Sequence, residues 1–448
     1  MPRTLEDFLG HMPELHSKML PASRGLMLPR TSKTMRAAVK DSDAVVEVRS
    51  GVKFRDGPDL LCKLTNLSAC CNVTVLRLQG CFLREDAGRS LAEFLRQNTT
   101  LASLDVGYNE LGEDGGRPLA EALRFNTTVT EFRIGGNSLF SDAGLAETLR
   151  VNATLTSLHM ELNSMGSEVG EAMAGALLVN TTLKLLNMDD NRLRQTGGEA
   201  LAHALRLNTT LRSLQLYSND LGDEAVQTLA ATLLVNTTLT DLGLQWNDLG
   251  EAAWPALATV LRLNTTLESI DLSDNTEIFA NATETFTYAL SSNATLLSLN
   301  LRNTSLHDDG TKALASALLV NTTLQSLNLG ENSIGREGAR ALVEVLRNNA
   351  TLTSLDLSEN EIGAAGGRAL AEALCLNTTL KSLDIGENGI EFGGARAMAE
   401  ALRVNTTLTS LDLDENEIGA AGGRALAEAL CLNTTLKSLR CRERDLLD

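Results

Sequence analysis

One sequence pattern recurs along most of this chain, and it limits what the chain can fold into. Each copy reads Leu-x-x-Leu-x-Leu and then, after two more residues, a polar residue that is usually asparagine. The copies are mostly 28 residues apart, with spacings of 26 between Asn137 and Asn163 and 29 between Asn275 and Thr304. A fixed period of this length is typical of chains that stack one small structural unit many times. We call these recurring sites the ladder positions: Cys81, Asn109, Asn137, Asn163, Asn191, Asn219, Asn247, Asn275, Thr304, Asn332, Asn360, Asn388, Asn416 and Arg444.

The repeat from Leu352 to Thr379 indicates how each unit folds. The triplet Leu355–Leu357 alternates apolar and polar residues, which predicts a short strand with one buried face. The segment Arg368–Leu374 predicts a helix, because it consists of helix formers with leucines four residues apart. We expect Gly366–Gly367 to open a turn before this helix and Asn377 to end it in the left-handed conformation. One strand and one helix cannot bury their apolar faces alone, so the units must stack.

These residues resemble the ribonuclease-inhibitor-like class of leucine-rich repeat proteins. The resemblance covers Val73 to Leu439, with a degenerate first unit near Val45. It implies an α/β leucine-rich repeat solenoid, or horseshoe, with a parallel β-sheet on the concave face and α-helices on the convex face. We expect residues 1–44 to form a helical N-terminal cap or a degenerate F-box-like segment, and residues 45–448 to form the solenoid with a short C-terminal cap.

The segment of residues 5–39 lies outside the repeats and leaves two interpretations open. The order Ser32-Lys33-x-Met35-Arg36 resembles an F-box, although Met35 replaces the expected tryptophan. In F-box proteins this segment docks the ubiquitin-ligase adaptor while the repeats select substrates. The other interpretation is a cap that covers the exposed apolar edge of the first repeat, which a solenoid requires. We favour the cap.

The composition counts against several classes of partner. The formal net charge is −18, from 57 acidic and 39 basic residues. Binding to nucleic acid or to an anionic membrane rests on clustered lysine and arginine, so we expect neither. The seven cysteines are odd in number and include no CxxC pair, which predicts reduced core residues. The first residues carry charges where a signal peptide needs an apolar run, so we expect a cytoplasmic protein that is monomeric when alone.

The sequence contains no pattern that we interpret as catalytic. The five histidines are widely separated and lack the spacing of metal ligands, and neither GxxxxGK[ST] nor GxSxG occurs. Acidic pairs such as Asp189-Asp190 occupy a recurring surface position, where nothing would raise the pKa of one carboxyl for acid–base work. We therefore expect no enzyme activity, cofactor or metal site.

Two sets of asparagines look functional in isolation, but we interpret both as structural. An amide at each ladder position can donate to and accept from neighbouring backbone, which would close the turn after the strand. The Asn-Thr-Thr step after each helix is a formal N-glycosylation acceptor. Its recurrence at one place in the repeat is better explained by a turn that ends the helix.

The concave face carries the sequence information that varies between repeats. Residues between the two leucines of the strand, and those just before the ladder position, should point away from the core. Tyr108, Tyr217 and Trp246 occupy such positions in a chain with only 3% aromatic residues. Interface hot spots are enriched in tryptophan, tyrosine and arginine, so we predict that these side chains bind a partner protein. The alternative is that they are isolated surface residues.

The same positions become uniformly acidic in the last repeats. Neighbouring parallel strands lie ~4.8 Å apart, so carboxylates in register repel one another unless they are neutralised. A basic segment of a partner protein would relieve this repulsion. The alternative is recent duplication, because Leu352–Leu383 and Leu408–Leu439 differ only at Ser358 and Asp414. The full predicted partner-binding set is Tyr108, Arg133, His159, Glu161, Asp189, Tyr217, Gln245, Trp246, Asp271, Arg302, Asp356, Glu359, Asp384, Glu387, Asp412, Asp414 and Glu415.

The sequence thus predicts a non-catalytic scaffold that recognises a partner protein on the concave face of its repeats. Two alternative functions stay open. An F-box-like N-terminus would make the chain the substrate receptor of a ubiquitin ligase. The resemblance also includes the activators of the Ran GTPase, which implies a GTPase activator as the second alternative. A shared architecture does not choose among these functions.

Overall fold

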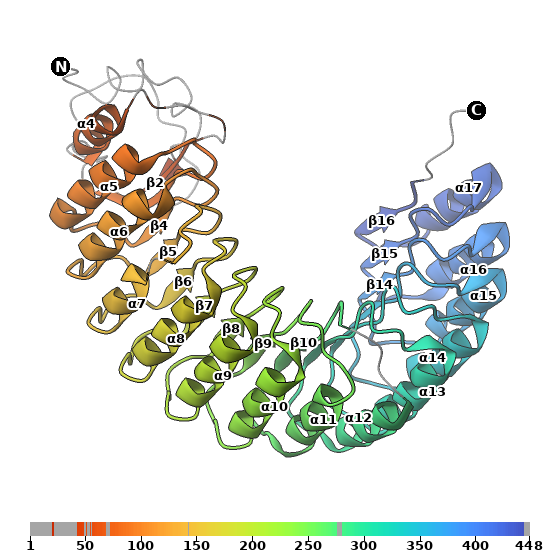
Figure 1. The fold of residues 1–448 in the computed structure, drawn as a ribbon. Helices are drawn as coiled ribbons and strands as arrows, with labels where there is room; N and C mark the ends of the chain where they lie inside the picture. The colour runs from red at the N-terminus through yellow and green to blue at the C-terminus, as the bar shows by residue number, and fades with distance from the viewer. Residues whose placement is uncertain are drawn as a thin grey trace, which may run out of the picture. The chain divides into compact units, whose positions relative to one another are not determined.

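The computed structural model describes residues 20–21, 43–48, 51, 54, 56–68, 72–141, 143–275 and 280–442. The chain forms two compact units, residues 1–220 and 221–448, which are described one at a time. In each unit, helices form one layer and strands the other (Figure 1). The predicted cap or F-box-like segment lies outside the described residues, apart from the short strand β1 (Leu20–Pro21).

In the first unit, strands and helices alternate along the chain. Strands β2 to β8 are parallel and pair in chain order, while β1 pairs with β2 in the antiparallel direction. The strands after β1 are β2 (Asp43–Glu47), β3 (Asn72–Arg77), β4 (Ser103–Asp105), β5 (Glu131–Arg133), β6 (Ser157–His159), β7 (Leu185–Asn187) and β8 (Ser213–Gln215). The helices are α4 (Gly57–Ser68), α5 (Glu85–Gln97), α6 (Gly112–Leu123), α7 (Gly144–Leu149), α8 (Gly166–Leu177) and α9 (Arg194–Leu205).

The second unit continues the same alternation. Strands β9 to β16 are parallel and pair in chain order, with equivalent residues of successive repeats opposite one another. The strands are β9 (Asp241–Gly243), β10 (Ser269–Asp271), β11 (Ser298–Asn300), β12 (Ser326–Asn328), β13 (Ser354–Asp356), β14 (Ser382–Asp384), β15 (Ser410–Asp412) and β16 (Ser438–Arg440). The helices are α10 (Gly222–Leu233), α11 (Ala253–Leu263), α12 (Ala280–Ser292), α13 (His307–Leu318), α14 (Arg336–Asn348), α15 (Gly363–Leu374), α16 (Glu391–Val404) and α17 (Gly419–Leu430).

The core lies between the two layers and consists mainly of leucine and alanine. The central residue of each short strand before β16 is buried, as at Leu327, Leu355 and Leu383, and successive helices pack side by side. On the helices, Leu370 and Leu374 are buried four residues apart, as their spacing predicts. The predicted α/β solenoid of parallel strands and helices is therefore confirmed.

The ladder asparagines join each repeat to the one before it. Asn360 Nδ2 donates to the carbonyl of Leu357 in its own repeat, at 2.9 Å, and to that of Leu329 in the preceding repeat, at 3.0 Å. Its Oδ1 accepts from the backbone N–H groups of Asn332 and Ile334, at 3.0 and 2.9 Å. These groups are buried, so an unmade bond would carry the full cost of desolvation. The structural interpretation of the ladder asparagines is confirmed.

The asparagines of the Asn-Thr-Thr steps form a second set of bonds at the other end of the repeat. Asn405 Nδ2 donates to the carbonyls of Leu374 and Asn377 in the preceding repeat, and its Oδ1 accepts from the N–H groups of Thr407 and Leu408. The side chain is only 5% exposed, so its amide is not accessible for glycosylation as folded.

The conformation expected of these helix-ending asparagines is wrong. We expected the left-handed region at Asn377, but that residue is not among the positive-φ positions, and the equivalent Asn405 has φ −72° and ψ 129°. The chain leaves the helix in an extended conformation because the side-chain amide takes over the bonding that a left-handed turn would provide.

The glycine pair also differs from expectation. Gly366 and Gly367 lie inside α15 rather than in a turn before it. A Cβ on Gly366 would stand 2.6 Å from Ile362 Cγ2, and one on Gly367 would stand 2.8 Å from Ile390 Cγ2. These glycines are therefore needed for the close packing of the helix. The glycine with a positive φ is Gly363 at the start of the helix, at +63°.

Most of the described cysteines are not core residues, which corrects a second expectation. Cys81 is buried, whereas Cys62, Cys375, Cys431 and Cys441 are exposed. Cys375 and Cys431 follow the last residue of their helices, where the chain turns outward. Within the described ranges, no helix combines the length and the apolar character that crossing a membrane requires.

Substitutions at Leu355 and Asn360 test the two kinds of contact that hold a repeat. Leu355→Ala should lower the free energy of unfolding by ~2–5 kcal/mol through lost packing and a cavity. Asn360→Leu should lower it by at least ~2 kcal/mol, because several buried backbone groups lose their partner. Urea denaturation followed by circular dichroism measures both.

Asn360→Thr is the matched control, since Thr304 fills a ladder position naturally, and it should lower the free energy of unfolding less than Asn360→Leu does. Equal stability of the leucine variant and the wild type would contradict the ladder account.

Candidate partner-binding face

The candidate site is the face of the strands turned away from the helices. We define the strand face as the outward residues of each strand together with the two residues between the strand's last leucine and the ladder position. In the short strands the outer residues are half-buried and the central one is buried. The outward residues are therefore accessible to a partner while the central leucines hold the core.

The residue just before the ladder position has a left-handed backbone in most repeats. The φ angle is 55° at Tyr108, 53° at Trp246 and 55° at Glu359. Glycine and asparagine accept this region most easily, and Gly136 and Asn303 occupy the same position in other repeats. A bulky side chain there costs on the order of 1 kcal/mol. The turn itself does not favour Tyr108 or Trp246, and the sequence pattern gives no sign of this conformation.

The three strand-face aromatics are exposed. Trp246 is 56% exposed, Tyr108 50% and Tyr217 37%, so none of them belongs to the core. The Tyr108 ring lies against the next repeat, where a Cβ on Gly136 would be 3.1 Å from its Cδ1. Tyr108 and Tyr217 belong to the first unit and Trp246 to the second. The Tyr108 ring is thus supported on one side by backbone, and all three aromatic side chains are open to solvent.

A polar cluster lies on the neighbouring strands β4 and β5 in the first unit. Arg133 Nη2 lies 2.8 Å from Glu131 Oε1, and Ser103 Oγ donates to Glu131 Oε2 at 2.9 Å. Burial raises the pKa of Glu131, but the hydrogen bonds from Arg133 and Ser103 outweigh it and leave that pKa below its usual value. Glu131 and Ser103 were not among the predicted site residues, because we considered only positions after the first strand leucine.

His159 lies beside this cluster and opposite Arg133 in the strand register. Its Nε2 is 3.0 Å from Ser157 Oγ. Burial and the nearby Arg133 cation lower the pKa of His159, while Glu131 acts in the opposite direction. A histidine that serves as a general base must become an imidazolium, which the arginine opposes. The serine–histidine contact therefore does not indicate catalysis.

Other predicted residues have partners within the fold. Asp189 Oδ1 accepts from the backbone N–H of Tyr217 at 2.7 Å, and Asp271 Oδ2 accepts from Asn300 Nδ2 at 2.8 Å. By contrast, Glu161 Oε2 and Gln245 Oε1 are buried atoms for which the described residues provide no hydrogen-bond partner. Both residues belong to the strand face, but these two oxygens have almost no surface exposed to solvent.

Arg302 is already neutralised by the chain itself. Its guanidinium pairs with Glu331 in the next repeat and with Glu359 in the repeat after that, and it donates to Ser358 Oγ. Burial lowers the pKa of Arg302, but the hydrogen bond that it donates to Glu359 and the charges of both carboxylates leave that pKa raised overall. Arg302 is thus a bridge across three repeats, and a partner would have to displace these contacts to use its charge.

The aspartates between the strand leucines share a structural role. Asp356, Asp384 and Asp412 each accept a hydrogen bond at 2.9 Å from the backbone N–H two residues later. Asn300 and Asn328 make the same bond through the amide oxygen, at 3.0 and 2.8 Å. The turn therefore needs an oxygen at this position but not a charge.

The three aspartates lie opposite one another on β13, β14 and β15 and repel. Burial, followed by the charges of Asp356 and Asp412, raises the pKa of Asp384 to about 6, although the bond from Gly386 acts against this. Arg440 pairs with Asp412 at 3.4 Å and also acts against the rise. The repulsion is therefore concentrated at Asp384, the middle carboxylate.

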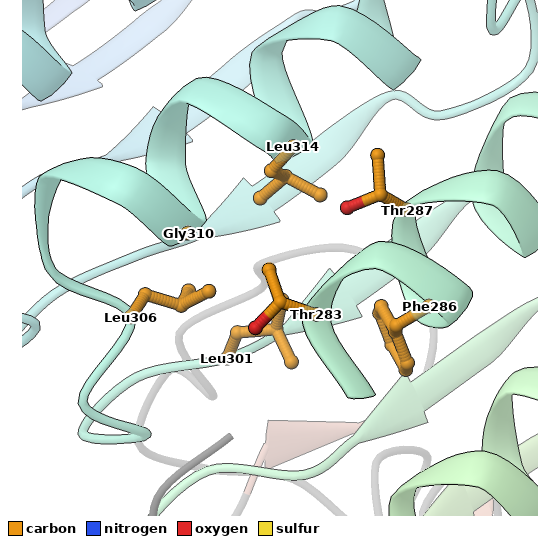
Figure 2. Close-up of a pocket in the computed structure, with 7 residues that line it drawn as sticks. All are labelled: Thr283, Phe286, Thr287, Leu301, Leu306, Gly310 and Leu314. Carbon is orange, nitrogen blue, oxygen red and sulfur yellow. The ribbon is translucent and has the colours of Figure 1, made fainter. Parts of the chain in front are cut away.

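A small cavity lies away from this face, between α12, α13 and the end of β11. Its volume is about 10 Å³, which is room for about one water molecule. Figure 2 shows its lining, namely Thr283, Phe286, Thr287, Leu301, Leu306, Gly310 and Leu314. No group of three or more potential metal ligands occurs in the part of the chain that the structure describes.

Comparison with known proteins gives a family model and several structural likenesses. A leucine-rich repeat model matches eight segments: 97–120, 179–202, 207–230, 292–315, 320–343, 348–371, 376–399 and 404–427. No curated protein matches the sequence. An internalin from Listeria monocytogenes is 17% identical, with a TM-score of 0.45, over 78% of this chain and 88% of that one.

Two further solved structures are similar, with lower TM-scores. The leucine-rich repeat-containing protein LegL7 from Legionella pneumophila is 19% identical, with a TM-score of 0.40, over 67% of this chain and 87% of that one. The actin-binding site 2 of leiomodin-1 is 23% identical, with a TM-score of 0.31, over 35% of this chain and 90% of that one. The chain therefore carries leucine-rich repeats in these eight segments, on a fold of alternating parallel strands and helices.

Proposed function

We propose that this chain is a non-catalytic scaffold that binds a partner protein across its strand face. The observation that carries the proposal is the pair Tyr108 and Trp246. Both are large aromatic side chains, half or more exposed, on a left-handed backbone that glycine or asparagine would adopt at lower cost. Neither packing nor turn geometry accounts for them, whereas aromatic anchors are common at interface hot spots.

The polar groups around these aromatics support the same function. Repeat proteins use their extended sheet surface to bind large partners. On this chain, Glu161 Oε2 and Gln245 Oε1 lack a hydrogen-bond partner and are buried as folded, so either side chain must turn outward on binding to accept from a partner's donor. A protein partner offers such donors along its backbone and side chains.

In the second unit, the acidic row formed by Asp356, Asp384 and Asp412 favours a basic segment of the partner. The turn at Asp384 requires only an oxygen, so the charge there is an additional cost to folding. A lysine or arginine from the partner would lower that cost on binding. Duplication of the repeats explains how the row arose but does not remove the repulsion, so both explanations can hold together.

The aromatic anchors are tested by substitutions that suit the turn. Trp246→Asn and Tyr108→Asn place at these sites the residue that Asn303 provides at the equivalent position, so the fold should keep its thermal stability. Capture of the partner from a lysate of the native cell, quantified by mass spectrometry, should fall by ~10-fold or more.

The matched control is Tyr288→Asn, which removes an exposed aromatic from helix α12. Capture should remain unchanged in this variant. If both strand-face variants capture the wild-type set of proteins at wild-type levels, the aromatic residues are not the binding site.

The acidic row predicts a dependence of stability on pH. An aspartate has a pKa of ~3.9 in an unfolded chain, whereas that of Asp384 is about 6 in the fold. Folding therefore favours the protonated form, and this stabilisation is full below about pH 4 and is lost as the pH rises through about 6. Asp384→Asn keeps the oxygen for the Gly386 N–H. It should raise the free energy of unfolding at neutral pH by on the order of 1 kcal/mol, a value already reduced for partial solvent exposure.

Urea denaturation over a pH series measures this effect. Asp105→Asn is the matched control, because Asp105 also accepts from the backbone two residues later but lies opposite Arg133 instead of another carboxylate. The control should not gain stability at neutral pH. If the free energy of unfolding of Asp384→Asn depends on pH in the same way as that of the wild type, the account of the acidic row is contradicted.

A triple variant separates binding from duplication. Replacing Asp356, Asp384 and Asp412 by asparagine keeps the turn bonds and removes three charges. If a basic segment docks there, partner capture should fall and become less sensitive to salt. Unchanged capture with unchanged salt dependence would leave duplication as the sole explanation of the row.

A further inference from the structure

The guanidinium of Arg302 lies in a cradle that the next two repeats form. An added Cβ on Gly330 would stand 2.9 Å from Arg302 Nη1, so the guanidinium lies directly against this glycine. Its charge is paired by Glu331 beside the glycine and by Glu359 one repeat later. Ser358 Oγ accepts a hydrogen bond from the same group. We call these residues the filled cradle: Gly330, Glu331, Ser358 and Glu359.

Nearly the same residues recur two repeats later along the chain. Gly330–Asn332 recurs unchanged as Gly386–Asn388, and Ser358–Asn360 recurs as Asp414–Asn416 with serine replaced by aspartate. The glutamates of both copies have left-handed φ angles between 51° and 55°, so their side chains leave the backbone in the same direction. We call the later residues the second cradle: Gly386, Glu387, Asp414 and Glu415.

The second cradle has a short residue in the place from which Arg302 reaches the filled cradle. Arg302 stands one repeat before Gly330, and the residue one repeat before Gly386 is Ser358. A serine is too short to extend over the next repeat, and the Ser358 hydroxyl donates to Asp356 in its own repeat at 2.7 Å. The preceding repeat therefore does not supply a guanidinium to the second cradle.

The floor of the second cradle is lined by oxygen atoms. Among the described residues, the three atoms nearest to an added Cβ on Gly386 are Asp384 Oδ1 at 3.3 Å, the Asp414 carbonyl oxygen at 3.4 Å and Asp412 Oδ1 at 3.8 Å. In the filled cradle, the amide oxygen of Asn328 stands at the same 3.3 Å. The second copy thus has a carboxylate where the first has a neutral amide, which strengthens its attraction for a cation.

Arginines at the end of the repeats neutralise only part of this charge. Arg440 pairs with Asp412 at 3.4 Å and Arg442 with Asp414 at 3.5 Å. Both arginine side chains are largely exposed, so solvent screens these pairs. The acidic row and the second cradle together carry six carboxylates: Asp356, Asp384, Glu387, Asp412, Asp414 and Glu415.

We propose that the second cradle binds the guanidinium of an arginine from the partner protein. The inference rests on the proposed function and names the residue of the basic segment that docks there. The guanidinium lies over Gly386, as that of Arg302 lies over the glycine of the filled cradle. It donates to Glu387, Glu415 and Asp414. A planar guanidinium offers donors in several directions at once, whereas a lysine ammonium is a compact, strongly hydrated charge that suits this cradle less well.

The test compares three blocked peptides of sequence Gly-Ser-X-Ser-Gly, in which X is arginine, lysine or citrulline. Ligand-observed NMR with the purified full chain at low ionic strength measures their dissociation constants. The lysine peptide should bind ~5-fold or more weakly than the arginine peptide. Citrulline has nearly the shape of arginine without the charge, and its peptide should show no measurable binding.

Two variants locate the binding at the second cradle. Gly386→Gln fills the floor with the residue that Gln245 provides at the equivalent position, and Glu387→Asn introduces the residue that Asn303 provides. The circular dichroism spectrum and the melting temperature should therefore match those of the wild type. The dissociation constant of the arginine peptide should rise by ~5-fold or more in each variant.

The matched control is Glu372→Gln, which removes one exposed carboxylate from α15 in the helix layer. It should bind the arginine peptide as the wild type does. Equal affinity for the arginine and lysine peptides overturns the proposal. So does wild-type affinity in both cradle variants, or an equal loss in the control.

These outcomes are separate from those that test the proposed function. Loss of partner capture in the aromatic variants, together with equal affinity for the arginine and lysine peptides, would overturn the cradle and leave the strand-face function standing. Unchanged capture in both aromatic variants, together with arginine binding that Gly386→Gln removes, would refute the aromatic anchors and support the cradle.

Discussion

The side-chain amide at the ladder position is the interaction on which the rest of the fold depends. It bonds to the backbone of its own repeat and of the preceding one, so its distance from the strand must be the same in every unit. An amide has two hydrogens and an accepting oxygen, whereas a hydroxyl has a single hydrogen to donate. The one threonine of the series, Thr304, coincides with the 29-residue spacing, where the repeat is irregular.

The second row of asparagines has a complementary effect at the helix ends. The Asn405 side chain donates to a carbonyl of the preceding helix and accepts from the N–H groups of the turn that follows. Two buried amides satisfy backbone groups at both ends of each unit, so the repeat does not fix every outward position, such as those of Tyr108 and Trp246. These positions on the strand face can therefore differ in composition from repeat to repeat. Function in such a protein is therefore expected at positions that the repeat leaves unconstrained.

The period and its alternation were sufficient to predict the strands, the helices, the buried leucines and the structural role of the ladder asparagines. They did not predict the backbone at Asn377 or the helical place of Gly366, because several backbone routes satisfy one apolar pattern. The strained turn at Trp246 was also missed, since φ is not visible in a hydrophobic pattern. Nor does sequence order indicate that Arg302 reaches Glu359 two repeats away. Local spacing predicts a unit, but pairing between units depends on three-dimensional contact.

The central claim is that the strand face, rather than the helix layer, binds the partner. Hydrogen exchange of the wild-type chain, alone and with its captured partner, tests this most directly. We predict slower exchange in the turns that hold Tyr108 and Trp246 and after β13 to β15, with no change at the centres of the helices. Protection confined to the helices, with unchanged exchange at those turns, would contradict the account.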